Sequence, residues 1–247
     1  MNKLIGISTE CLYYWVPQKN WVQEQIDIIN ILKKYVSRVE LHFTAEDILN
    51  FDDNYFDLYL KETKDLSLSF HLPSLSTEIW QLEKLLEKIG EIMQKLNIEY
   101  AVWHAADFAE IEIAVGKISP QFKFGLENSD PRKFGFQHLK DIAILGSYPI
   151  ILDIDHVDEI KKDSLNEEMI KLRNNVLAIH FSTPSNEFFK KFIDIQTTHF
   201  PFSKSDRVPP KELPKNIPIL IEGVFPKSDY ALIEEEVSLV KNNYFNN

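Results

Sequence analysis

Eight short apolar segments recur along this chain of 247 residues, and a longer amphipathic segment separates each from the next. Their nearly continuous apolar character is typical of strands buried on both faces of a parallel sheet. They occupy residues 3–8, 38–43, 66–71, 100–105, 122–127, 149–154, 176–181 and 218–223. Between them, most clearly over residues 77–96, apolar residues recur every three or four positions, as in helices with one buried face. We therefore predict eight strands that alternate with helices.

The spacing of the apolar segments decides between two α/β folds. Eight units in 247 residues give about 31 residues per unit, which suits a series of right-handed β–α–β crossovers. An open doubly wound sheet normally has about five to seven strands and a glycine-rich first turn. Here the first turn reads STECLYYW, and the whole chain contains seven glycines. The sequence predicts a (β/α)8 TIM barrel, a single domain over residues 1–247 whose last helix spans 228–243 with Ser228 as its N-cap.

The composition indicates which cellular compartment and which kinds of binding partner to expect. Cys11 is the only cysteine, so an internal disulfide is excluded and a reducing, cytoplasmic setting is expected. The first residues lack the layout of a signal peptide, and no apolar run approaches the ~18 residues that a membrane span needs. The net charge of −11 disfavours nucleic acids and anionic membrane surfaces as partners, because both are bound through basic patches. A small-molecule substrate is expected, and homo-oligomer formation is left open.

Polar side chains gather where the predicted strands end. In a TIM barrel the active site lies at the C-terminal ends of the strands, where the βα loops converge. Five of the seven histidines lie at or just past such an end, and His199 lies in the long loop before the last strand. The residues at these ends are Glu40, His42, His71, His104, Glu127, Asp153, Asp155, His156, His180 and Glu222.

This collection of residues favours a metal site over a purely structural network. A single histidine at a strand end is more often a hydrogen-bonded structural residue, and His42 is interpreted in that way. Glu40 is equally explained as the buried partner of a nearby lysine or arginine. Burying several carboxylates and imidazoles together, however, costs on the order of several kcal/mol per unpaired charge. One to three divalent ions, Zn, Mn or Co, would remove that cost, and Glu127 is a candidate bridge between two of them.

The order of short motifs resembles the xylose isomerase-like TIM-barrel superfamily. These motifs are HLP (71–73), WH (103–104), LENSD (126–130), LDIDH (152–156), IHF (179–181) and IEG (221–223). The superfamily contains the sugar and sugar-phosphate isomerases and epimerases, and also the endonuclease IV-type nucleases of AP endonuclease family 2. The resemblance covers nearly the whole chain.

The isomerase and epimerase branch implies a set of four metal ligands. Its members match Glu127, Asp153, His180 and Glu222 in this sequence. In that branch the two glutamates also act as catalytic acid and base, moving a proton between adjacent carbons. His156, three residues after Asp153, matches a histidine that binds substrate or metal.

The endonuclease IV branch implies nine ligands for three zinc ions. Beyond the five positions above, His71, His104 and His199 match its histidines. The aspartate that precedes the last of these histidines is replaced by Thr197. Eight of the nine positions are therefore filled, and the third metal is in question.

Three hypotheses follow. The first is a divalent-metal-dependent isomerase or epimerase of a small sugar or sugar phosphate, with catalytic Glu127 and Glu222. For its substrate, Lys204 and Arg207 are candidates to bind a phosphate, and Trp15 is a candidate to stack on a sugar ring. The alternative is a zinc-dependent phosphodiesterase that acts at apurinic sites in DNA. DNA is the less expected partner because the composition is acidic. A barrel that binds a metal or ligand without turnover is the third.

Overall fold

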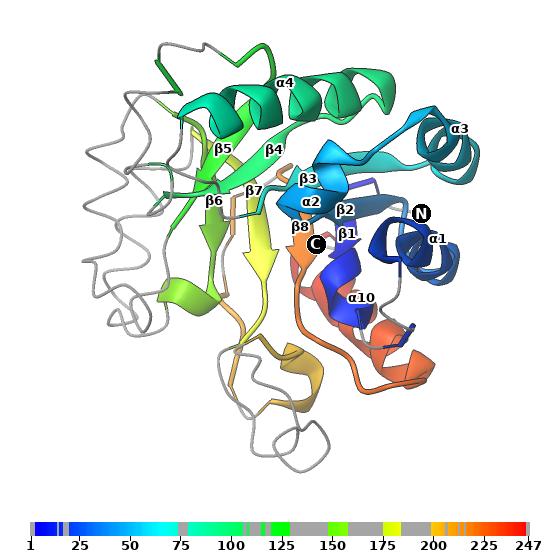
Figure 1. Cartoon of the computed structure of the whole chain (residues 1–247). Helices are drawn as coiled ribbons and strands as arrows, with labels where there is room; N and C mark the ends of the chain where they lie inside the picture. Colours follow the sequence, from blue (N-terminus) through cyan, green and yellow to red (C-terminus); the bar gives the residue numbers. More distant parts are fainter. Residues whose placement is uncertain are drawn as a thin grey trace.

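The computed structural model contains a closed barrel of eight parallel strands, which confirms the predicted (β/α)8 architecture (Figure 1). The strands follow one another around the barrel in sequence order, and β1 pairs with β8 to close it. An open doubly wound sheet is therefore excluded. The structure describes residues 3–13, 15–16, 20–73, 79–105, 108, 115–116, 120–128, 148–157, 175–183, 199–205, 207–211, 213–214 and 216–245.

Each strand lies within the apolar segment predicted for it. The strands are β1 (Ile5–Ser8), β2 (Arg38–His42), β3 (Ser67–His71), β4 (Ala101–His104), β5 (Phe124–Glu127), β6 (Ile150–Asp153), β7 (Val176–Phe181) and β8 (Ile219–Ile221). The near-continuous apolar character has a simple cause, since one face of each strand meets the barrel interior and the other meets the surrounding helices.

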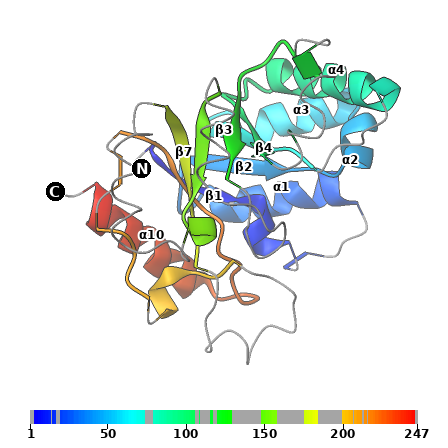
Figure 2. The same cartoon turned by 90° about the vertical axis from the view of Figure 1, so that its left-hand side faces the viewer.

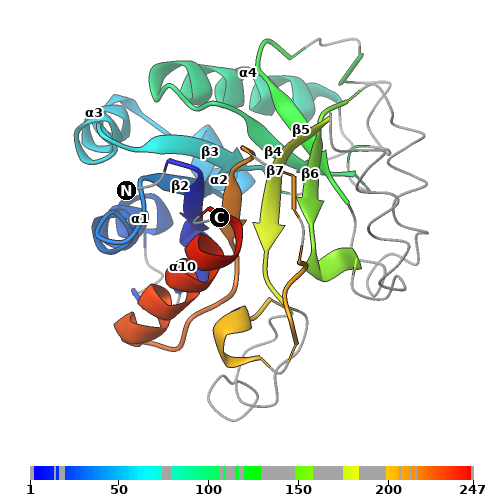
Figure 3. The same ribbon diagram turned by 180° about the vertical axis from the view of Figure 1, so that it is seen from behind.

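The described helices lie outside the barrel. They are α1 (Trp21–Leu32), α2 (Ala45–Leu49), α3 (Asp53–Glu62), α4 (Ile79–Lys95) and α10 (Tyr230–Tyr244), with 3-10 turns η1 (Thr9–Leu12), η2 (Asp155–Val157) and η3 (Phe202–Lys204). Helices α1 to α4 cover one side of the barrel, whereas α10 packs against β1 and β8 (Figures 2 and 3). None of the helices in the described part of the chain is long and apolar enough to span a membrane.

The start of α10 differs from the prediction. Asp229 is the N-cap, because its Oδ1 accepts a hydrogen bond from the backbone N–H of Leu232 at 3.1 Å. Ser228 precedes the cap in the left-handed region, with φ of 63°. Prediction of Ser228 as the N-cap was therefore wrong by one residue. Thr197 and most of the helical segments expected between β5 and β8 lie outside the described residues.

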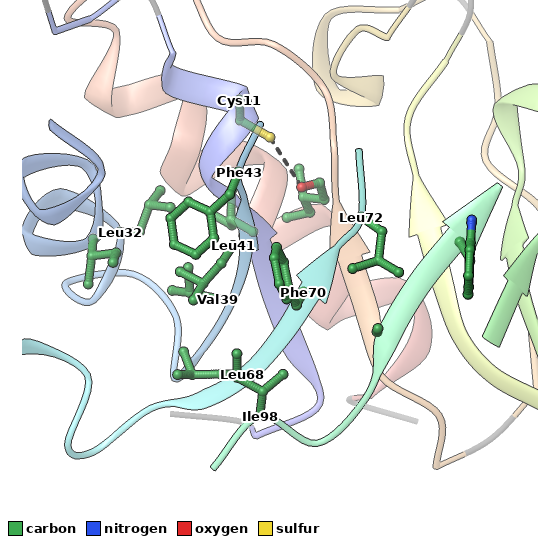
Figure 4. Close-up of a cluster of buried hydrophobic side chains, with 14 of the residues drawn as sticks. Cys11, Leu32, Val39, Leu41, Phe43, Leu68, Phe70, Leu72 and Ile98 are labelled. Carbon is green, nitrogen blue, oxygen red and sulfur yellow. Dashed lines mark hydrogen bonds between the residues drawn. The ribbon is translucent and has the colours of Figure 1, made fainter. Parts of the chain in front are cut away.

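The apolar side chains form two layers because successive strand residues face opposite sides of the sheet. The outward residues Val39, Leu41 and Phe70 pack in the larger core, to which Leu32 of α1 also belongs (Figure 4). The inward layer fills the middle of the barrel and consists of Tyr100, Val102, Ile151, Ala178 and Leu220. Further along the same inward face, at the C-terminal ends of the strands, the residues change from apolar to polar.

Candidate metal centre

The last inward position of six consecutive strands carries a side chain with a metal-ligating atom. Strand register brings these positions to one level, since His104 pairs with Glu127 and Asp153 pairs with His180. The structure thus brings together most of the cluster that the sequence predicts. The six side chains are His71, His104, Glu127, Asp153, His180 and Glu222, the last of which directly follows β8.

Glu127 lies between two groups of possible ligands. Its Oε2 is 3.2 Å from His71 Nε2 and 3.3 Å from His104 Nε2. Its Oε1 is 3.2 Å from His180 Nδ1. Glu127 and His180 are both buried, so these contacts are shielded from water. A carboxylate with histidine nitrogens at both oxygens has the arrangement expected of a bridging ligand.

The four ligands that the isomerase branch implies converge in one group. Glu127, Asp153, His180 and Glu222 offer ligand atoms that all lie within 4.8 Å of one another. Glu222 Oε1 is 3.0 Å from His180 Nδ1, the same nitrogen that faces Glu127. Asp153 and His180 have no exposed surface, whereas Glu222 is partly exposed at the barrel mouth.

A third group forms where β6 ends. Asp153, His156 and His199 offer ligand atoms within 4.8 Å of one another. The Nδ1–H of His156 donates to the backbone carbonyl of Asn128 at 2.7 Å, so Nε2 is the ring nitrogen that can bind a metal. The Asn128 side chain accepts from Asp153 N at 2.7 Å and donates to Asp153 O at 2.9 Å. Asn128 therefore holds the ends of β5 and β6 together beneath the group.

His199 lies at the barrel mouth because backbone hydrogen bonds and close packing hold its segment against the ends of β7 and β8. Thr183 and Phe200 exchange two backbone hydrogen bonds of 2.8 and 2.9 Å. A Cβ on Gly223 would lie 2.5 Å from the backbone nitrogen of Pro201, so only glycine allows this close approach. His199 is thus held in place by backbone packing, although it lies in a loop.

The charges of the cluster fit a bound cation. Burial, together with the charges of Glu222 and Glu127, raises the pKa of Asp153 well above its usual range. Among the described residues, no lysine or arginine forms an ion pair with these three carboxylates. Divalent metals of the Zn, Mn or Co type bind mixed nitrogen and oxygen donors and would supply the positive charge. The residues present therefore fit such a metal.

Three predicted substrate-binding residues lie elsewhere. Trp15 is buried, and its Nε1–H donates to the carbonyl of Phe225 at 3.1 Å. Lys204 Nζ forms an ion pair of 2.5 Å with Glu235 of α10, and Arg207 is exposed in the same loop. The structure does not bring these residues into the ligand groups, and their role in substrate binding stays a prediction.

A cavity of about 600 Å³ lies beside the cluster. Its lining includes Glu10, Trp21, His42 and Tyr55. The His42 ring is 5.4 Å from the His71 ring, centroid to centroid, so the cavity borders the candidate metal centre. The charge of His42, opposed by burial, lowers the pKa of Glu10. Sequence reasoning missed Glu10, although it follows the first strand closely and the strand-end criterion would have found it.

No protein-family model and no curated protein sequence matches the chain. Several solved structures, however, do match the chain. A sugar phosphate isomerase/epimerase from Parabacteroides distasonis is 15% identical, with a TM-score of 0.60 over 98% of this chain and 94% of that chain. D-Psicose 3-epimerase, crystallised in the presence of D-fructose, is 13% identical, with a TM-score of 0.58 over 97% of this chain and 98% of that one. At these identities the similarity shows a shared fold, which is the barrel that the resemblance to the xylose isomerase-like superfamily implies.

Proposed function

We propose that this chain is a divalent-metal-dependent isomerase or epimerase of a small sugar, with Glu127 and Glu222 as its proton-transfer residues. The observation that carries the proposal is their convergence: the two carboxylates lie 3.2 and 3.0 Å from the same nitrogen, His180 Nδ1. Asp153 completes the group. The structural neighbours named as a sugar phosphate isomerase/epimerase and a psicose epimerase support the same kind of reaction.

Interconversion of adjacent sugar carbons requires a base that removes a proton from carbon and an acid that returns one. A bound metal would polarise the sugar oxygens and make the carbon-bound proton more acidic. Burial opposes the charge of Glu127, but His180 and His71 outweigh it and keep its pKa low in the metal-free protein, so Glu127 is ionised, which is the form that can accept a proton. Burial raises the pKa of Glu222 in the same metal-free state. Carboxylates bind metals in their ionised form, so a bound metal would lower the pKa of Glu222.

The cavity beside the cluster supports a sugar without a phosphate. Trp21 and Tyr55 offer aromatic surface, which packs against the C–H faces of sugar rings, and Glu10 and Asp47 offer acceptors for hydroxyl groups. Among the described residues that line this cavity, none is a lysine or an arginine. An uncharged sugar therefore fits this lining better than a sugar phosphate does.

The test is solvent proton exchange into sugars. Protein loaded with Mn, Co or Zn is incubated in D2O with a panel of ketoses and aldoses, and NMR detects deuterium at the carbon beside the carbonyl. We expect exchange with at least one sugar, and a loss on the order of 100-fold in both Glu127→Gln and Glu222→Gln. Glu99→Gln, which changes an exposed glutamate before β4, is the matched control. Absence of exchange with every sugar and metal would overturn the proposal.

A second candidate function rests on the two outer ligand groups. His71 and His104 meet Glu127, and His156 and His199 meet Asp153, so ligands for more than one ion are present. This observation favours a zinc-dependent phosphodiesterase that acts at apurinic sites. Nicking of an abasic duplex oligonucleotide, dependent on His71 and His104, would establish it. Metal binding with neither sugar exchange nor nicking would leave the barrel as a binding protein without turnover.

A further inference from the structure

A carboxylate lies on the far side of His180 from the candidate metal centre. Glu40 of β2 has no exposed surface, and its Oε1 is 3.4 Å from His180 Nε2. Its Oε2 accepts a hydrogen bond from Ser69 Oγ at 3.0 Å. Glu40 and Ser69 are directly paired in the β2–β3 register, so the backbone fixes their approach. The side chains of Ser69, Glu40 and His180 therefore form a buried series of polar contacts that ends at the candidate metal centre.

The two ring nitrogens of His180 face different partners. Nδ1 faces Glu127 and Glu222, the proposed metal ligands, whereas Nε2 faces Glu40. A neutral imidazole carries one proton, and a metal binds the nitrogen that lacks it. Without a metal, Nδ1 hydrogen-bonds Glu127. Once an ion engages Glu127 and Glu222, Glu40 is the carboxylate that faces Nε2, and because an ionised carboxylate only accepts hydrogen bonds, it favours the tautomer with the proton on Nε2. That tautomer leaves the lone pair of Nδ1 directed at the ligand group.

Other partners for these atoms are missing from the described structure. Glu40 Oε1 and His180 Nε2 are both buried, and neither makes a hydrogen bond to a described residue, so their mutual contact of 3.4 Å is the ion-pair contact that would become a hydrogen bond in the proposed tautomer. The expected alternative, a basic partner for Glu40, is not what the structure contains. Arg38, two residues earlier on the same face of β2, pairs with Glu99 at 2.8 Å. Ser69 occupies Oε2 and so turns Oε1 toward His180.

We propose that Glu40, oriented by Ser69, is a positioning residue that holds His180 in the tautomer presenting Nδ1 to the metal. The inference rests on the metal site of the proposed function and adds residues that do not touch the ion. Residues of this kind, which hydrogen-bond the second nitrogen of a ligating histidine, typically change metal affinity by about 10- to 100-fold when removed.

The experiment compares metal affinity and tautomer in full-length variants. Glu40→Gln keeps an acceptor without charge, and we expect about 10-fold weaker zinc binding with the tautomer retained. Glu40→Leu removes the acceptor, and we expect about 100-fold weaker binding and a mixture of tautomers. Removing one partner of a buried charged pair typically destabilises a protein, so circular dichroism checks that each variant folds, and Glu40→Gln carries the test if Glu40→Leu does not fold. Competition with a chelating dye measures affinity, and ¹⁵N NMR of histidine-labelled protein reports the protonated nitrogen.

Matched variants separate positioning from general packing. Ser69→Ala should weaken zinc binding in the same direction but by less than Glu40→Leu. Ser67→Ala, on the same face of β3 but two residues earlier, should leave the affinity unchanged. Glu236→Gln removes another buried carboxylate, on α10, and should leave the His180 tautomer unchanged. Wild-type affinity and tautomer in both Glu40 variants would overturn the inference alone. Failure of the wild-type protein to bind any of the three metals would overturn the proposed function as well.

Discussion

At the scale of single residues, His71 shows how the cluster behaves without a metal. Its Nδ1–H donates to the carbonyl of Leu72 at 3.1 Å, and its Nε2 lies 3.2 Å from Glu127 Oε2. Burial opposes protonation, but the hydrogen bond and charge of Glu127 outweigh it and raise the pKa of His71 to about 9. Both ring nitrogens therefore carry protons in the metal-free protein at neutral pH.

This raised pKa makes the stability of the metal-free protein depend on pH. The folded-state pKa of about 9 exceeds the ordinary histidine value of 6.5. Protonated His71 therefore stabilises the fold fully below pH 6.5, and this contribution is lost as pH rises through 9. The shift corresponds to about 3 kcal/mol. Urea unfolding of EDTA-treated protein between pH 6 and 9.5 should show a smaller decline in His71→Gln than in wild type.

The control for this measurement is a neighbouring histidine with the opposite shift. Burial lowers the pKa of His42, so His42→Gln should leave the decline between pH 6.5 and 9 in place. Equal slopes in wild type and His71→Gln would contradict the assigned pKa.

How well the sequence predicts the position of a side chain also differs from residue to residue, for a physical reason. Glu127, Asp153 and His180 lie on strands, where the two-residue alternation fixes the side to which each side chain points. Trp15 and Lys204 lie in loops, which have no such period. Their sequence positions are compatible with several directions, and in the structure they contact Phe225 and Glu235.

At the scale of elements, β1 depends on a glycine in the barrel interior. A Cβ on Gly6 would lie 2.6 Å from Leu220 Cδ1 and 2.8 Å from Arg38 Cγ. Gly6→Ala should therefore lower the free energy of unfolding by about 1–3 kcal/mol, the usual cost of overpacking. Thermal or urea unfolding measures it. Gly90→Ala is the control: it lies within α4, and its Cβ would be 3.7 Å from Phe122. There alanine should be neutral or stabilise by up to ~1 kcal/mol, and equal effects at both sites would contradict the packing argument.

Elements were predictable where many residues share one pattern, and less so where one residue decides. All eight strands fall within their predicted segments because each prediction rests on three or more apolar positions. The start of α10 rests on a choice between the neighbours Ser228 and Asp229, both good N-caps. The backbone conformation decides between them, because an N-cap residue normally has a negative φ, whereas Ser228 has a φ of 63°.

At the scale of the whole molecule, the candidate metal centre joins distant parts of the chain. Its ligand groups draw side chains from β3, β4, β5, β6 and β7 and from the residue after β8. An ion bound by the four-ligand group would therefore connect the C-terminal ends of β5, β6 and β7 with the residue after β8. Stability and metal binding should be coupled, because the unfolded chain holds no such arrangement of donors.

This coupling gives a test that requires no substrate. Zinc, manganese or cobalt at about 100 times its dissociation constant should stabilise the fold by about 2.7 kcal/mol. For a chain of this length, the unfolding temperature should rise by roughly 5–10 °C. Asp153→Asn should reduce the rise, because Asp153 belongs to two ligand groups. Calorimetry with and without metal measures the shift, and Glu99→Gln should retain it. Calcium should give a smaller rise, since it prefers oxygen ligands alone. An equal rise in Asp153→Asn and wild type would place the bound ion outside the cluster at the barrel mouth.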